Sequence, residues 1–336
     1  MKLPLKWRLR MPKLLFSIWW RLVFCLATLI AGPSFAVQPY PARPIRIIVP
    51  FAPGGGTDVI ARSVAQHLSR ALGGSVVVEN RAGAGGTVGS NAAAKAAPDG
   101  YTLLIATNAT FALAPGLYTQ LNYDPARDFV PIALVATGPS ILVVNPQLPV
   151  TSSAAFVAYA KANPDKLNYG SAGNGSMAHI ATSLFNQLSG AKSTHVPFKG
   201  GAMAVQELVA GRLQFMIAGP VESIPLVQSG HLRALAVTTS TRFPSMPGLP
   251  PLAESLPGYD ITNWYSLVAP AGTSVDIVNT LARHIRAMLA IKDVQEMLAQ
   301  QGVEAKSMDG QALRDFMRDD MVKWTRTVRQ MGIATD

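Results

Sequence analysis

The sequence predicts an α/β protein of two lobes, each a mainly parallel β-sheet flanked by helices, with the ligand cleft between the lobes. Three observations indicate this fold. Short β-branched segments alternate with helical segments, glycine-rich turns join them, and the pattern restarts after a proline-rich stretch at 128–139. Such alternation is typical of parallel sheets with crossover helices. We expect lobe one at 37–137 plus 266–336, and lobe two at 138–265.

Residues 1–36 have the order of a cleavable signal peptide. They contain six basic and no acidic residues, then an apolar run at Leu22–Ile30 and a small-residue pattern ending at Ala36. The run is short for a membrane span of about 20 residues, so cleavage after Ala36 is favoured over an uncleaved anchor. The only cysteine, Cys25, lies in this segment. The exported chain would then lack disulfides, cysteine–zinc sites and a cysteine nucleophile.

The net charge of +10 does not indicate a nucleic-acid partner. Without residues 1–36 the chain holds 23 basic and 19 acidic residues, a net charge of +4. Hydrophobic residues make up 49% and charged residues 14% of the sequence, a composition typical of a globular protein. We therefore expect an exported protein that binds no nucleic acid.

The first half of the chain repeats one unit. The β-branched run Ile45–Val49 predicts a buried strand, the glycine loop Gly54–Asp58 follows, and apolar spacing predicts a helix from Val59 to Leu72. Further segments of this half are a strand at Val76–Val78, the glycine-rich turn 83–86, a helix at Asn91–Ala97 and a strand at Tyr101–Ala106.

The second half repeats the same alternation after residue 139. It predicts strands at Ile141–Val144, Leu167–Gly170 and Phe215–Ala218, and helices at Ser153–Ala162, Met177–Leu188 and around Val205–Leu208. A strand at Tyr265–Ala269 and helices from Val275 to Trp324 follow. We assign this last part to lobe one, by analogy with folds in which the chain crosses back through a hinge.

Glycine loops at strand ends are the expected site. Ligands of parallel α/β sheets lie beyond the carboxyl ends of the strands, and helix N-termini there favour an anion. A carboxylate or a phosphate would fit the loops at 54–58 and 83–87, although each loop alone could be a plain turn. The GxGxxG spacing and a Walker lysine are both lacking, which argues against a nucleotide.

Catalysis and metal binding have weak support. Ser176 and His179 could share a helical face, as in a serine hydrolase, but the surroundings are not G-x-S-x-G and no acid is evidently placed to orient His179. The simpler expectation is that Ser176 donates to a ligand oxygen at a helix start and that His179 supports the loop. The five histidines show no metal-ligand spacing, so we expect no metal or cofactor and no enzymatic activity.

Two charged residues have more than one interpretation. Lys199 either offers a cation to an acidic ligand or is a solvated lysine on a turn. Asp58 either pairs with a ligand amino group or caps the helix expected from Val59, and residue preference favours capping.

Several motifs occur in order along the chain from Tyr40 to Gly272. They include Pro53-Gly54-Gly55-Gly56-Thr57-Asp58, Glu79-Asn80-Arg81, Pro98-Asp99-Gly100-Tyr101, Gly173 to His179, His195-Val196-Pro197-Phe198-Lys199-Gly200, Trp264 and Ala269-Pro270-Ala271-Gly272. Together, in this order and spacing, they resemble the Bug family, the periplasmic solute receptors of tripartite tricarboxylate transporters.

The resemblance implies a type II periplasmic binding protein that holds a small carboxylate solute, a di- or tricarboxylate, amino acid or aromatic acid. It further implies integral membrane transporter subunits as partners, and we expect a monomer; a sensory receptor is the alternative. Phe198 stands where the family often has tyrosine, and a buried Glu222 would select against a second ligand carboxylate. The expected ligand-binding residues are Gly54, Gly55, Gly56, Thr57, Asp58, Thr107 and Asn108 from lobe one, and Ser171, Gly173, Ser176, His179, Lys199, Gly200, Gly201, Ala202, Ala218 and Gly219 from lobe two.

Overall fold

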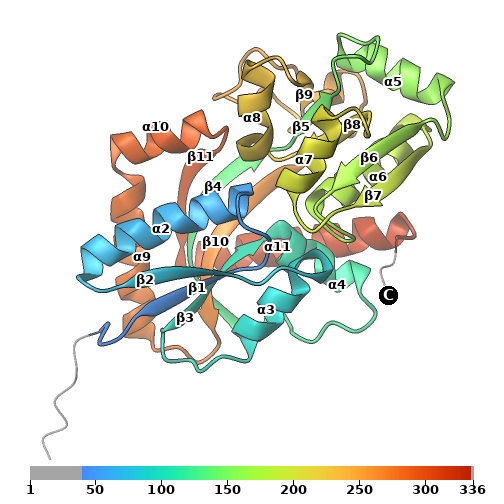
Figure 1. The fold of residues 1–336 in the computed structure, drawn as a ribbon. Helices are drawn as coiled ribbons and strands as arrows, with labels where there is room; N and C mark the ends of the chain where they lie inside the picture. Colours follow the sequence, from blue (N-terminus) through green and yellow to red (C-terminus); the bar gives the residue numbers. More distant parts are fainter. Residues whose placement is uncertain (1–39, 334–336) are drawn as a thin grey trace, which may run out of the picture. The chain divides into compact units, whose positions relative to one another are not determined.

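Two β-sheets with flanking helices make up the computed structural model, which describes residues 40–333 (Figure 1). The expected signal peptide at 1–36 lies outside the described residues. Among the residues described, no helix combines the length and the apolar character needed to cross a membrane.

The first sheet combines strands from both ends of the chain. β1, β2, β3 and β4 run in one direction, whereas β10 and β11 run antiparallel to their neighbours. Its spatial order is β11 (Glu304–Asp309), β4 (Phe129–Pro139), β10 (Thr262–Pro270), β3 (Thr102–Thr107), β1 (Ile45–Val49) and β2 (Val76–Asn80).

The second sheet is formed by the middle of the chain. β6, β7 and β8 are parallel, and β5 runs antiparallel to both β8 and β9. Its order is β7 (Ser193–Pro197), β6 (Leu167–Ser171), β8 (Phe215–Ala218), β5 (Ile141–Val144) and β9 (Arg233–Val237). Most strands of each sheet share one direction, which confirms the predicted α/β class with mainly parallel sheets.

Helices cover both sheets. The helices that pack against the first sheet are α2 (Gly56–Leu72), α3 (Thr87–Ala94), α9 (Val275–Leu289), α10 (Lys292–Gln300) and α11 (Gly310–Gln330). The helices that pack against the second sheet are α5 (Ser153–Ala162), α6 (Met177–Ser189), α7 (Gly201–Val209) and α8 (Pro220–Gln228). The short helix α4 (Ala114–Leu117) packs against α11.

Helix α2 illustrates how the sequence sets an element. One face, with Ile60, Val64 and Leu68, is fully buried against the first sheet, and Gly73 ends the helix in the left-handed conformation at φ 64°. The helix begins at Gly56, three residues before the expected Val59, because Gly55 takes the N-cap position.

The proline-rich stretch at 128–139, for which no strand was predicted, contains strand β4, in the interior of the first sheet between β10 and β11. Proline supplies no N–H to a ladder, so prolines argue against a central strand. Here Pro131 lies opposite Val268, next to a shift in register between Leu267 and Val268. The irregular pairing accommodates the proline, and the sequence analysis did not find this strand.

Candidate ligand-binding site

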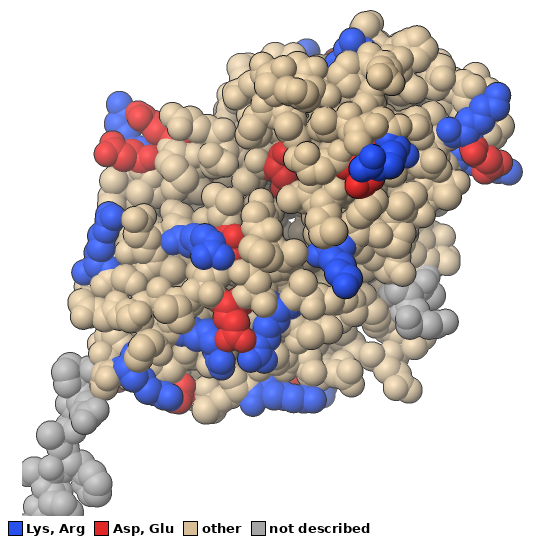
Figure 2. All heavy atoms as spheres, viewed as in Figure 1, with Lys and Arg blue, Asp and Glu red and all other residues tan. Residues whose placement is uncertain are grey.

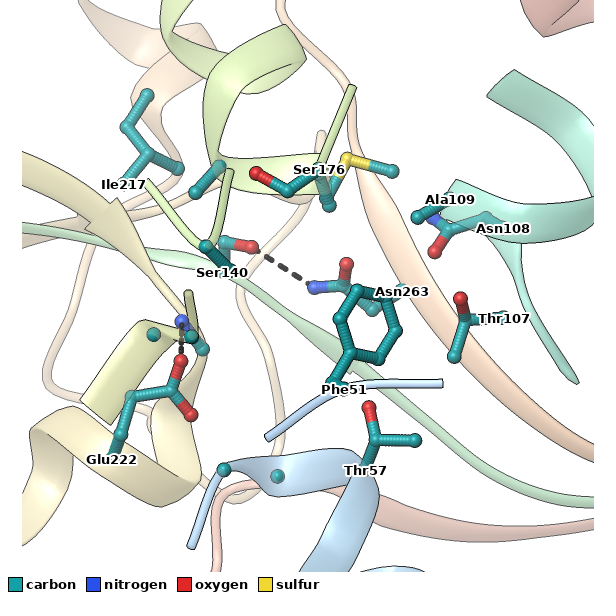
Figure 3. A pocket seen from close by; sticks show the side chains of 18 of the residues that line it. Phe51, Thr57, Thr107, Asn108, Ala109, Ser140, Ser176, Ile217, Glu222 and Asn263 are labelled. Carbon is teal, nitrogen blue, oxygen red and sulfur yellow. Dashed lines mark hydrogen bonds between the residues drawn. The ribbon is translucent and has the colours of Figure 1, made fainter. Parts of the chain in front are cut away.

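A cavity of about 100 Å³ lies where loops and helix starts from the two sheets meet (Figure 3). From the first sheet and its helices, Phe51 follows strand β1 and Thr57 lies in the first turn of α2. From the second, Ser176 directly precedes α6 and Ile217 lies in strand β8. Asn263 donates from Nδ2 to Ser140 Oγ at 2.9 Å, and both residues lie on the two segments that connect the sheets. The cavity therefore combines groups that the chain brings together from distant positions.

Four helices begin at this cavity. Gly55 is the N-cap of α2, Ser176 of α6, Gly200 of α7 and Gly219 of α8, and all four residues line it. The first N–H groups of a helix lack partners within the helix and carry a partial positive charge. None of the described lining residues is Lys, Arg or His. The anion-attracting character of the cavity thus comes from backbone dipoles rather than from side-chain cations.

The structure brings part of the expected site to the cavity. The residues that line it are Gly55, Gly56, Thr57, Thr107, Asn108, Ser176, Gly200, Gly201 and Gly219. The others, Gly54, Asp58, Ser171, Gly173, His179, Lys199, Ala202 and Ala218, are outside its lining. Contact between any of these residues and a solute stays a prediction.

Asp58 lies beneath the first glycine loop, only 3% exposed. Its Oδ2 accepts from Gly54 N at 3.1 Å and from Arg62 Nε at 2.9 Å, and its Oδ1 accepts from Asn80 Nδ2 at 2.9 Å. Burial by itself would raise the pKa of Asp58, but these hydrogen bonds outweigh it and hold the pKa below its ordinary value. As the third residue of α2, Asp58 ties the loop to the helix start and does not face the cavity.

His179 and His195 support the loop that precedes α6. Their rings stack with centroids 4.1 Å apart and planes 6° apart. His195 Nε2 is 2.6 Å from Ser171 Oγ, and His179 Nδ1 accepts from Gly175 N at 3.2 Å. Burial lowers the pKa of both imidazoles, and the neighbouring His179 helps to lower that of His195 to about 4. Both rings are therefore neutral at pH 7.

The Ser176–His179 pair lacks the contact that a hydrolase would need. Ser176 Oγ accepts from the backbone N of His179 at 3.4 Å, as a helix cap, while the imidazole is bonded to Gly175 N. A nucleophile would instead donate its proton to the imidazole. The pair thus has the geometry of a helix start, in line with the support that we expected from His179.

Other expected residues lie elsewhere for clear reasons. Lys199 is exposed to solvent, and Ala218 is fully buried within β8. Ser171 is also fully buried, with its hydroxyl engaged by Gly173 and His195. Ser171 and Ala218 thus hold a loop and the core in place rather than lining the cavity, and Lys199 lies at the surface.

Sequence reasoning singled out Glu222 for solute selection, and it lines the cavity, but several other lining residues were missed. They are Phe51, Ala52, Ala109, Ser140, Ala172, Met177, Ala178, Met216, Ile217, Asn263 and Tyr265. Phe51, Ala52, Ala109 and Ala172 are next to expected positions, so strand-end placement could have found them. Nothing local in the sequence points to Ser140 or Asn263, which reach the cavity through the crossings between the sheets.

Glu222 brings a carboxylate to the cavity. As the third residue of α8, it accepts from Gly219 N at 3.2 Å through Oε1 (Figure 3), and the N–H of Gly56 is a further donor. Burial raises the pKa of Glu222 above its ordinary value, and the hydrogen bonds from backbone donors offset only part of this effect. The chain therefore places an acidic group among helix starts that would otherwise attract an anion.

Comparison with known proteins identifies the family. The model of the tripartite tricarboxylate transporter family receptor (TctC) matches residues 60–333. Protein BugT of Bordetella pertussis is 40% identical over 316 residues, which span 92% of this chain and 95% of BugT. A solved structure of R. palustris Rpa4515 with adipate has a TM-score of 0.85 and 36% identity, covering 88% of this chain and all of that one (100%).

Two further solved structures agree. The periplasmic binding protein BugD has a TM-score of 0.84 and 33% identity, covering 88% of this chain and 100% of BugD. MatC of Rhodopseudomonas palustris with bound malate has a TM-score of 0.81 and 33% identity, covering 86% of this chain and 100% of MatC. These likenesses confirm the expected periplasmic-binding-protein fold. The chain belongs to the tripartite tricarboxylate transporter receptor family, the TctC and Bug family of solute-binding proteins.

Proposed function

We propose that this chain is a periplasmic receptor that binds a small carboxylate in the cavity by closure of its two halves. It then presents the solute to the membrane subunits of a tripartite transporter. The observation that carries the proposal is the convergence of the starts of α2, α6, α7 and α8 on one cavity without a lining cation. Such helix starts bind carboxylates through backbone N–H groups.

Two relatives support the solute class. Rpa4515 was solved with adipate and MatC with malate, and both solutes are carboxylates. The proposed mechanism is a shift of population between an open and a closed form. A solute that contacts the elements of both sheets stabilises the closed form by the difference between its binding free energies for the closed and open forms. The proposed cycle has no covalent step, in keeping with the role of Ser176 Oγ as a helix cap, and the receptor releases its solute unchanged.

The test is a binding screen with the purified protein against small carboxylates, amino acids, phosphates and nucleotides. A solute at a hundred times its dissociation constant should stabilise the protein by about 2.7 kcal/mol, which thermal unfolding detects. We expect hits among carboxylates, confirmed by calorimetry. Hits restricted to phosphates or nucleotides would contradict the proposed solute class.

A variant with a matched control locates the site. Gly55 lines the cavity at φ −87°, and a Cβ added there meets nothing within 4 Å. The change Gly55→Leu should therefore fill the cavity and abolish binding while the fold persists. Gly248 is exposed and equally open around its Cβ, so Gly248→Leu should bind normally. Equal affinity in both variants would place the binding site elsewhere.

Handover to a transporter is tested in cells. Deletion of the gene should abolish uptake of the solute identified in the screen, and the intact gene should restore it. Uptake that persists in the deletion strain would contradict the transport role.

A further inference from the structure

Glu222 packs against the starts of three helices at one end of the cavity. Its Oε1 accepts from Gly219 N at the start of α8, and Gly56 N at the start of α2 donates to the same carboxylate. A Cβ built on Gly201, at the start of α7, would be only 2.5 Å from Oε1, and one on Gly219 would be 2.8 Å from Oε2. The carboxylate therefore sits where an incoming anion would otherwise meet these helix starts.

No cationic side chain among the described lining residues of the cavity neutralises Glu222. Among the described lining residues it is the single one whose side chain is ionisable as an acid or base near neutral pH, and no lysine, arginine or histidine lines the cavity beside it. Its partners are backbone N–H groups, which are already engaged. A second anionic group brought to this end would either meet a like charge or force Glu222 to take up a proton, and it would find the backbone donors already in use.

The opposite end of the cavity is different. Figure 3 places Thr107 and Asn108 on the side away from Glu222, with Phe51 and Asn263 between them. Thr107, Asn108 and Asn263 are uncharged and polar, and the start of α6 at Ser176 adds further N–H groups. One anionic group is accommodated there without opposition from a resident acid.

We infer that Glu222 occupies the subsite of a second solute carboxylate, so that this receptor selects solutes with one carboxylate and a hydrogen-bond donor at the far end. The donor is a hydroxyl, an amide or an ammonium group, each of which a carboxylate accepts from. This inference rests on the proposed function, since it names the solute class of the same cavity. Adipate and malate, the solutes in the Rpa4515 and MatC structures, each carry two carboxylates. The inference therefore separates this chain from those two relatives.

The experiment compares pairs of solutes of equal length by calorimetry: succinate with its half-amide, and adipate with its half-amide. The wild-type protein should bind the half-amide of a pair at least tenfold more tightly than the diacid. In Glu222→Gln, which keeps the shape but cannot ionise, the preference for the half-amide should fall at least tenfold. Glu296→Gln is the matched control: its side chain is 58% exposed on α10, and the preference should be unchanged.

The outcomes are distinguishable. Wild-type binding of diacids with a preference that Glu222→Gln leaves unchanged would overturn the inference while the receptor function stands. No binding of any carboxylate in the screen would instead contradict the proposed function itself. Should Glu222→Gln fail to fold, judged by circular dichroism, Glu222→Ala serves in its place, and failure of diacid affinity to rise there would equally overturn the inference.

Discussion

Acid should destabilise this protein through the stacked imidazoles. The pKa of His195 is about 4 in the folded chain against 6.5 for an unperturbed histidine, because the ring is half-buried and lies against His179. Between these two pKa values the unfolded chain therefore binds a proton at His195 that the folded chain does not bind. The contribution of the neutral ring to the free energy of unfolding is fully present above pH 6.5 and is lost as the pH falls from there toward 4.

The two pKa values set the size of the effect. For this one group the linkage relation gives a loss of at most about 2 kcal/mol between pH 7 and pH 5, and at most about 3 kcal/mol below pH 4, because solvent around the partly exposed ring screens the effect. With an unfolding entropy of about 2.1 cal/mol/K per residue over about 300 residues, 2 kcal/mol corresponds to a fall of about 3 °C in Tm.

The variant His195→Gln removes the titration while its amide can still pair with the Ser171 hydroxyl, which is 2.6 Å from Nε2. The assay is thermal and chemical unfolding of both proteins at pH 7, 6 and 5. We expect the variant to lose up to about 2 kcal/mol less than the wild type over this range. His231→Gln, at an exposed histidine, should follow the wild type. Parallel pH dependence in wild type and His195→Gln would refute the reasoning.

Two further predictions concern the loops around the cavity. A Cβ on Gly85, at φ +62°, would be 2.7 Å from the carbonyl oxygen of Asn174, whereas Gly73, at φ +64°, has nothing within 4 Å. Alanine should cost about 1–2 kcal/mol of stability at Gly73, from the positive φ alone, and more at Gly85, where the backbone of Asn174 must also shift. Only Gly85→Ala should weaken solute binding, at least fivefold by calorimetry, and equal affinities would show that this contact is not needed. Asp58→Asn should lower the free energy of unfolding by about 1–3 kcal/mol at pH 7, since it weakens the bond from Gly54 N. That loss should shrink as acid protonates the wild-type carboxyl, whose pKa is below its ordinary value, and an unchanged denaturation midpoint at pH 7 would contradict the role given to Asp58.

Local patterns were enough to predict most elements of the fold. The helices at Ser153–Ala162 and Val275–Leu289 and the strand at Ile141–Val144 begin and end where the sequence predicts. The periodic spacing of apolar residues and the glycines at the ends of helices and strands are properties of neighbouring residues, so they can be detected without knowledge of the tertiary structure. Strand β4 was missed because its prolines carry the local signal of a linker, and its irregular pairing with β10 depends on residues more than a hundred positions away.

The candidate site divides in the same way. Strand–loop–helix order alone placed Gly55, Gly56 and Thr57 at a carboxyl-terminal strand end, because parallel strands gather those ends at one edge of a sheet. The sequence also selected the neighbouring Asp58 and the later His179, but their side chains turn away from the cavity into hydrogen bonds with the loops.

The sequence by itself thus determined the two-sheet α/β class, the family and the glycine loops that line the cavity. The tertiary structure decided which side chains line the cavity. Ser140 and Asn263 are 123 positions apart and meet through a 2.9 Å hydrogen bond at the crossings between the sheets. The carboxylate of Glu222 meets Gly56 only because α8 and α2 come together. Contacts of this kind depend on how distant segments pack, and no local periodicity or motif encodes them.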